Sequence, residues 1–182
     1  MADGTIDALR SQPDVFDYAQ NNQYQVTMSN FPLTQFFCMG LTVPGLSLSA
    51  LERATPLKII PTVGDTLTYE NFNMEFFVDE ELRNYREVHD WMVNIGFPYS
   101  HDQFMATKRR DNSTERGGDL DLYSEIIVTI LSSKNNPLVR VKIHESFPIN
   151  LSGITYTNAE TDITYLTAEV SFAYSWYEFE SV

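Results

Sequence analysis

The stretch Leu166–Tyr177 reads LTAEVSFAYSWY, and its apolar and polar residues alternate with a period of two. The apolar phase comprises Leu166, Ala168, Val170, Phe172, Tyr174 and Trp176. An extended strand with one buried face and one solvated face produces this alternation. At roughly 3.3 Å per residue the stretch predicts one strand of about 40 Å, beside a usual length of about 17–20 Å. So long a strand in a chain without a catalytic motif favours a structural protein over an enzyme.

The same period recurs upstream and predicts a mainly β domain of antiparallel strands. Strands are expected at residues 23–28, 36–42, 72–78, 126–131 and 139–144. Segment 126–131 is apolar on both phases and is expected at the centre of a sheet, whereas 139–144 has one charged face. About six to eight strands in all favour a two-sheet β-sandwich or barrel.

The pattern weakens over residues 46–65, which are expected to form a long loop. Pro56 and Pro61 flank a short apolar run that suits an edge strand at 57–60. Gly64-Asp65 is expected to form a turn before the next strand.

One segment, Asp79–Ile95, has the periodicity of an amphipathic helix. Its apolar stripe comprises Leu82, Tyr85, Val88, Trp91, Met92 and Ile95. Asp79 is expected to cap the helix, with Glu80 and Glu81 at the positive end of its dipole. Gly96 and Pro98 end it, so a single flanking helix over about 79–95 is predicted.

Two polar segments lack a pattern of this kind. Residues 1–20 are expected to form an N-terminal arm, and residues 21–182 one β domain that carries a mobile loop at about 108–121. The loop contains Lys108-Arg109-Arg110 and Arg116, a third of the positive charge. A loop that contacts phosphate and a solvated or salt-bridging loop are both open interpretations, and the acidic chain favours the second.

The charge balance excludes several partners. Asp and Glu number 25 against 12 Lys and Arg, which gives a net charge of -13. Such a chain does not grip nucleic acid by neutralising phosphates, and it is repelled by anionic membranes. With no signal-peptide pattern and no long apolar run, the protein is expected to be made in a reducing cytoplasm.

No residue pattern predicts catalysis, a cofactor or a metal site. The histidines His89, His101 and His144 are scattered and have no second ligand at zinc spacing. Asp79-Glu80-Glu81 is explained by helix capping, and Cys38 in an apolar run is expected to be a small core residue. We therefore assign no catalytic, cofactor-binding or metal-ligating residue.

The order of several short motifs is similar to that of a known family. These motifs are Gly64-Asp65 before a strand, Phe76-Phe77-Val78-Asp79-Glu80 before a helix bearing Asp90-Trp91, and Phe147-Pro148-Ile149 before a final strand with residues 169–174. Together they resemble the tail-tube proteins of contractile-tailed bacteriophages, over roughly residues 24–177. Within that family, residues 78–85 with Trp91 and Gly96-Phe97-Pro98 look most like tail completion proteins.

The resemblance implies a two-sheet protomer with a flanking helix that joins others edge to edge in a homohexameric ring. A ring of this kind removes open sheet edges. It implies that DNA passes through the lumen without specific binding, and that acidic residues there repel phosphate. The implied partners are further copies, adjacent tube rings and neck or sheath proteins, with no membrane. The implied location is the virion tail, assembled in the host cytoplasm.

Several roles stay open at this point. The leading hypothesis is a tail completion or tube terminator protein, because the arm and the basic loop offer a second docking surface. The alternatives are the major tail tube subunit, a tube-like protein of a bacterial secretion or injection system, and a β-barrel module that binds a ligand or peptide. An enzyme is not expected.

Overall fold

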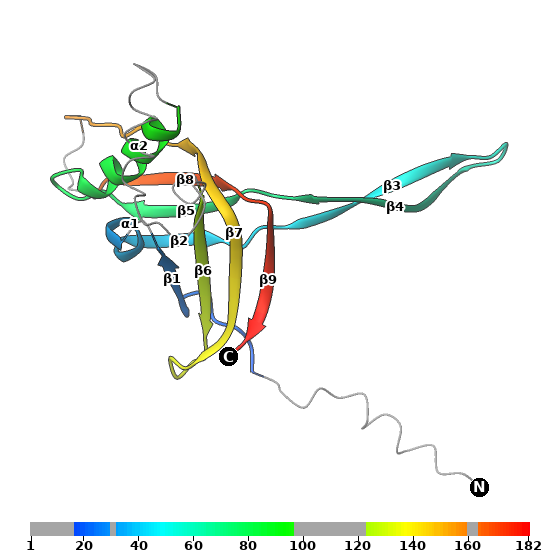
Figure 1. The fold of residues 1–182 in the computed structure, drawn as a ribbon, viewed down its shortest axis with the longest axis horizontal. Coiled ribbons are helices and arrows are strands. Elements are labelled where there is room, and N and C mark those ends of the chain that lie inside the picture. Colours follow the sequence, from blue (N-terminus) through cyan, green and yellow to red (C-terminus); the bar gives the residue numbers. More distant parts are fainter. Residues whose placement is uncertain (1–16, 30–31, 97–122, 160–163) are drawn as a thin grey trace, which may run out of the picture.

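Two antiparallel β-sheets share one long strand, and a separate hairpin projects from them (Figure 1). The computed structural model describes residues 17–29, 32–96, 123–159 and 164–182. The elements are β1 (Tyr24–Met28), α1 (Pro32–Phe36), β2 (Cys38–Thr42), β3 (Leu46–Ala54), β4 (Ile59–Tyr69), β5 (Phe72–Phe77), α2 (Arg83–Gly96), β6 (Ser124–Leu131), β7 (Pro137–Leu151), β8 (Thr167–Ala173) and β9 (Trp176–Ser181). The predicted mainly β, antiparallel two-sheet class is confirmed.

We call the two sheets sheet A and sheet B. Sheet A has the order β1-β6-β7-β9, and sheet B the order β7-β8-β5-β2. In Figure 1 the strands of sheet B run across those of sheet A.

The expected N-terminal arm lies mostly at residues 1–16. The expected loop 108–121, with Lys108–Arg110 and Arg116, lies between residues 97 and 122. Both fall outside the described residues, so the division into arm, domain and loop stays a prediction.

Strand β7 passes from one sheet to the other at a corner near Glu145. Pairing with β6 extends to Ser146 and pairing with β9 to His144, whereas residues from Phe147 pair with β8. Glu145 has a φ of 55°, a conformation that few residues with a side chain adopt. The buried Ser146 hydroxyl donates to the Ser124 carbonyl at 2.6 Å, which ties the corner to β6. Strands that switch sheets at such bends make the corners of orthogonally packed sheets.

The predicted single strand over 166–177 is wrong. It is two strands, β8 and β9, separated by a bend at Tyr174-Ser175. Ala168, Val170 and Phe172 are buried as the alternation predicts, but Trp176 is exposed. After the bend the chain leaves sheet B and pairs with β7 in sheet A, so the buried phase changes. The long strand of this protein is β7, where the sequence predicted only residues 139–144 and a connection from Phe147.

The core lies between the two sheets and under α2. Its buried apolar residues are Val26, Met28, Phe72, Met74, Phe76, Val88, Trp91, Ile126, Val128, Val141, Ile143, Ala168, Val170 and Phe172. The predicted buried phases of β1, β5 and β7 are therefore confirmed, and β6 lies between β1 and β7 as the central strand that was predicted. The Trp91 ring lies 6.2 Å from the Phe172 ring, which joins α2 to sheet B. Tyr85, Met92 and Ile95 also pack against the core, so the predicted apolar stripe faces inward.

The start of the helix differs from the prediction. α2 begins at Arg83, its first turn has no acidic residue, and Leu82 before it has a φ of 56°. The Asp79 carbonyl instead accepts a bond from Leu82 N at 2.8 Å, and the Glu81 carboxylate pairs with Arg83. Asp79-Glu80-Glu81 therefore form the turn before the helix, and the predicted cap at Asp79 is wrong.

The side chain that organises this turn is Asn84, which is fully buried. Its amide nitrogen donates to the Phe77 carbonyl at 2.6 Å, and its oxygen accepts from Asp79 N at 3.2 Å and Tyr85 N at 2.8 Å. The Thr34 hydroxyl of α1 contacts the Asn84 carbonyl at 3.3 Å. The Asn84 side-chain amide thus joins the end of β5, the turn and α2, while its backbone carbonyl contacts α1.

Two further segments differ locally from the prediction. Phe36 lies in the short helix α1, which Pro32 begins, so the strand expected at 36–42 starts only at Cys38. The loop expected at 46–65 is the hairpin of β3 and β4, and Pro61 lies within it opposite Glu52. A two-stranded hairpin has only edge strands, which tolerate proline. The turn expected at Gly64-Asp65 is a bulge inside β4, between the pairs Leu48–Leu67 and Ala50–Val63.

Replacing Asn84 with alanine is expected to lower the free energy of unfolding by about 2–3 kcal/mol, because buried backbone groups lose their partners. Urea unfolding followed by Trp fluorescence measures this. The control Arg86→Ala, on the exposed side of the same helix, should change stability by about 0.5 kcal/mol or less. Equal effects of the two substitutions would show that Asn84 does not organise the turn.

Replacing Gly64 with alanine is expected to fray the hairpin, because a Cβ there would collide with the backbone carbonyl of Ser49. Overpacking of this kind costs about 1–3 kcal/mol, so trypsin should cut at Arg53 and Lys58 about tenfold faster or more. Gly153→Ala is the matched control, since a Cβ there meets nothing within 4 Å. Unchanged cleavage of the Gly64 variant would contradict the bulge geometry.

Candidate assembly interface

The residues considered for chemistry do not form a reactive site in the described part of the chain. His89 is exposed on α2, where its ring lies 3.1 Å from the Asp90 carboxylate, while His101 lies outside the described residues. No group of three His, Cys, Asp or Glu among the described residues is arranged to hold a metal ion. Cys38 is half-buried, and burial raises the pKa of its thiol, as expected for a packing residue.

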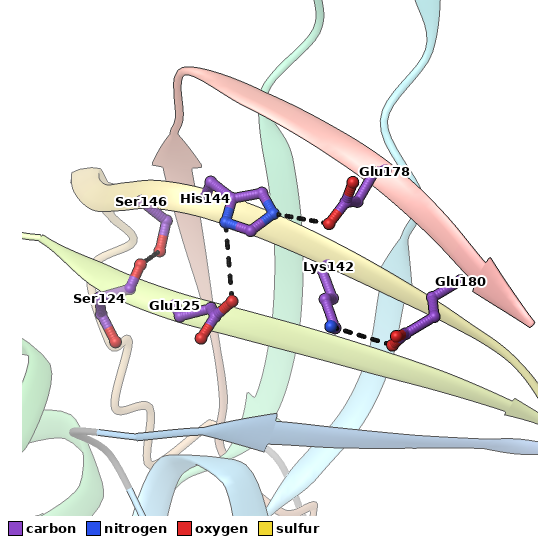
Figure 2. A network of polar contacts seen from close by, with 7 residues as sticks. All are labelled: Ser124, Glu125, Lys142, His144, Ser146, Glu178 and Glu180. Atoms are coloured by element: carbon purple, nitrogen blue, oxygen red, sulfur yellow. Dashed lines mark hydrogen bonds and ion pairs between the residues drawn. The ribbon is translucent and has the colours of Figure 1, made fainter. Parts of the chain in front are cut away.

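The outward face of sheet A carries cations matched by carboxylates (Figure 2). Lys142 Nζ lies 2.9 Å from Glu180 Oε2, and this contact raises the pKa of Lys142 and lowers the pKa of Glu180. The His144 ring lies 3.6 Å from Glu125 and 3.3 Å from Glu178, on opposite ring nitrogens. The predicted charged face of 139–144 is confirmed, and across this sheet its charges are paired.

The outward face of sheet B has the opposite character. The four segments that form this sheet, β2, β5, β8 and residues 147–151 of β7, contain no Lys, Arg or His. Glu75 of β5 lies directly opposite Glu169 of β8, on the face away from the core. Like charges opposite each other destabilise a strand pair by about 0.2–1 kcal/mol. A stability cost placed on an exposed face points to a role for the negative charge outside the protomer.

Both borders of sheet B are open within the described residues. β2 pairs only with β5, and residues 147–151 of β7 pair only with β8. The two borders lie on opposite sides of the same sheet, so one can accept the other from a neighbouring copy. Open edges of this kind are the sites where chains join by strand pairing.

The hairpin of residues 46–69, which we call the hairpin arm, extends away from the sheets (Figure 1). Every residue of β3 is exposed, as is every residue of β4 except Gly64 and Tyr69. Its exposed large apolar residues are Leu46, Leu48, Leu51, Leu57, Ile59, Ile60, Val63 and Leu67. An isolated two-stranded hairpin is marginally stable in water. An apolar arm of this length is therefore suited to packing against another molecule.

A cluster of tyrosines fixes the root of the arm to the sheets. The rings of Tyr69, Tyr174 and Tyr177 lie 5.7–6.1 Å apart in edge-to-face contacts. Burial, with smaller contributions from Tyr177, Tyr69 and Glu70, raises the pKa of Tyr174 to about 12. The cluster joins the end of β4 to the bend between β8 and β9, so the direction of the arm is set by the body of the protein.

At the other end of sheet B lies an apolar groove of about 670 Å³, which we call the aromatic groove. Its lining residues are Phe37, Phe77, Val78, Asp79, Glu80, Tyr156, Thr164, Tyr165 and Leu166. The Phe77 and Tyr165 rings lie 6.2 Å apart, edge to face. Glu87 holds α1 against α2 by accepting bonds from the Thr34 amide at 3.0 Å and hydroxyl at 2.8 Å, which places Phe37 beside the groove.

Sequence reasoning missed both features. The arm had a signal, since Leu46-Ser47-Leu48 and Leu67-Thr68-Tyr69 alternate with a period of two, but the two prolines favoured a loop. The groove had no sequence signal, because its residues come from separate segments that only the fold brings together.

The sequence matches the family model described as phage tail tube protein over residues 11–180. No curated protein sequence matches this chain. Within the described residues, no helix combines the length and apolar character needed to cross a membrane.

Several solved structures share the fold at 10% sequence identity. A sheath/tube terminator of an extracellular contractile injection system has a TM-score of 0.53, covering 92% of this chain and 100% of that one. The tube-terminating cap of the anti-feeding prophage has a TM-score of 0.52, with coverage of 98% and 99%. A chain of the six-fold symmetrised baseplate of the same prophage has a TM-score of 0.50, with coverage of 94% and 97%.

Replacing Glu75 and Glu169 together with glutamine is expected to raise the free energy of unfolding by about 0.2–1 kcal/mol, because repulsion across the strand pair is removed. Glu178→Gln with Glu180→Gln makes the same chemical change on sheet A and should lower stability instead, since these carboxylates face His144 and Lys142. The urea midpoints of the two double variants and the wild type, measured at one protein concentration, give the sign of each change in stability. A shift of the same sign in both variants would contradict the difference between the two faces.

Proposed function

This chain belongs to the phage tail tube protein family, and on that premise we propose that it forms a homohexameric ring bounding the channel of a tail tube. The family is structural, and its members are tube proteins rather than enzymes. The observation that carries the proposal is the pair of open borders of sheet B, whose exposed face bears carboxylates and no cation.

Pairing of β2 with residues 147–151 of the next copy joins the sheets of neighbours edge to edge. The contact is heterologous, because each copy contributes two different borders. A heterologous contact closes into a ring when its rotation matches the symmetry, and closure leaves no open edge on sheet B. Six-fold symmetry is that of the baseplate structure whose chain shares the fold.

Sheet B is the surface that suits the channel wall. Glu75 and Glu169 would repeat around the lumen and repel the phosphates of passing DNA. The channel then conducts DNA without binding it. Sheet A, with balanced charges, is left to face outward toward sheath or neck proteins in the virion tail, which is assembled in the host cytoplasm.

The position that the geometry supports best is the body of the tube. Each protomer has a projecting apolar arm at one end of sheet B and an apolar groove at the other, so a ring has two faces that fit repeated stacking. A tube terminator, which caps the tube, is the second candidate. The solved cap and terminator structures favour it, as they share the fold over nearly the whole chain.

The purified protein is expected to form rings with a native mass of six times 20.9 kDa, visible as annuli with an open centre by electron microscopy. Long tubes at high concentration support the major subunit, and rings that never stack support the terminator.

A strict monomer at all concentrations would overturn the ring and favour a binding module. The charge of the lumen is tested separately. Rings of the Glu75→Lys, Glu169→Lys variant should retain DNA at low salt, whereas wild-type rings should not. Equal retention of DNA by wild-type and variant rings would show that sheet B does not line the channel.

A further inference from the structure

The β2 border of sheet B carries three exposed apolar side chains, which we call the border strip. Phe36 of α1 is 82% exposed, and Leu33 and Met39 on either side of it in sequence are 41% and 39% exposed. A single exposed apolar residue needs no explanation, but a group of them beside an open sheet edge marks an interaction surface.

Helix α1 is held in place, so the border strip has a fixed position. The Gln35 side chain accepts a bond from the Met28 amide at 2.8 Å, and further bonds join α1 to α2. The Phe36 ring lies 5.2 Å from the Phe37 ring, edge to face. A side chain fixed in this way loses little conformational freedom when it docks.

The opposite border of sheet B carries an apolar groove, which we call the border groove. It has a volume of about 450 Å³ and lies between α2 and the end of β7, with Met92, Val93 and Ile149 in its lining. The Tyr85 hydroxyl donates to the Ser152 carbonyl at 3.1 Å, which fixes the helix against the strand. The volume lies within the range of about 300–1,000 Å³ typical of specific sites, so the groove has room for an aromatic side chain.

Strip and groove lie at opposite borders of sheet B but at the same end of it. Figure 1 shows α1 beside β2 and α2 beside the end of β7, both at the end opposite the hairpin arm. Both helices are also on the core side of the sheet, because α2 packs on the core and α1 is bonded to α2. Pairing of β2 with residues 147–151 of the next copy therefore brings the border strip of one copy beside the border groove of the other.

We infer that Phe36 of one copy inserts into the border groove of its neighbour in the same ring. This rests on the proposed ring, to which it adds a second lateral contact outside the plane of sheet B. Strand pairing alone leaves the rotation between adjacent strands free over roughly 10–35°. The second contact fixes the angle between neighbours, and this angle decides after how many copies a heterologous contact closes.

A photocrosslinker at position 36 tests the contact directly. Phe36→p-benzoylphenylalanine keeps an aromatic side chain, and irradiated rings should give crosslinked dimers whose joined peptides contain Met92, Val93 or Ile149. The same substitution at Leu138, which is exposed on β7 away from both surfaces, is the matched control and should not link to these peptides. Dimers joined through any other segment, or an absence of dimers, would overturn the insertion.

Two variants test each half of the contact by its effect on the ring. Phe36→Ser removes the inserted side chain, and Gly96→Leu fills the groove, where a Cβ meets nothing within 4 Å and the fold should be unchanged. Each should raise at least tenfold the protein concentration at which half of the rings dissociate, measured by native mass. The controls Leu138→Ser and Gly96→Ala, whose methyl group is too short to fill the groove, should form rings like wild type.

Rings of normal stability in either Phe36→Ser or Gly96→Leu would overturn the insertion and leave the proposed ring standing on strand pairing alone. A wild type that forms no rings at any concentration would overturn the proposed function itself and this contact with it. The native mass of the wild type therefore separates the two failures before any variant is compared.

Discussion

Both sheets depend on the corner of β7, because this one strand is hydrogen-bonded in each of them. Its first half joins β6 and β9, its last five residues join β8, and Glu145 at the corner keeps a left-handed backbone. The Ser175 hydroxyl reaches the Glu145 carboxylate at 2.5 Å and the Ser175 amide reaches the His144 carbonyl at 3.2 Å. The corner of β7 and the bend between β8 and β9 therefore hold each other, and the crossing of the sheets follows.

This geometry explains why the two outward faces differ in charge. On sheet A, β9 lies beside β7, so Glu178 and Glu180 fall opposite Lys142 and Arg140 in register and neutralise them. On sheet B, β8 lies between β7 and β5, and register places Glu169 opposite Glu75, with no Lys, Arg or His in the strand segments of this sheet. A single shared strand thus gives one face of mixed charge and one face whose charged residues are all acidic. Stability alone would favour removing this repulsion, so the negative charge points to a role outside the protomer.

The sequence correctly predicted the elements that keep one periodic pattern along their whole length. The buried phases of β1, β5 and β8 and the apolar stripe of α2 follow from alternation or helical spacing, because each faces one core. Periodicity failed where the chain changes partner. Tyr174-Ser175 continues the alternation although it leaves one sheet for another, and the corner at Glu145 looks like an ordinary charged position. The groove and the acidic pair were out of reach, since register decides which residues meet, and only the fold sets register.

The hairpin arm is the part of the chain that the protomer does not stabilise by itself. Apart from its tyrosine root it buries almost nothing, and its apolar side chains face water. An exposed edge hairpin of this kind is an aggregation hazard, and proteins retain one only where it is blunted or used. Here Pro61 and the bulge at Gly64 interrupt the regular ladder, which limits unspecific strand pairing while the apolar surface remains. An arm kept apolar yet protected against random pairing is what a protein that joins copies in one defined geometry requires.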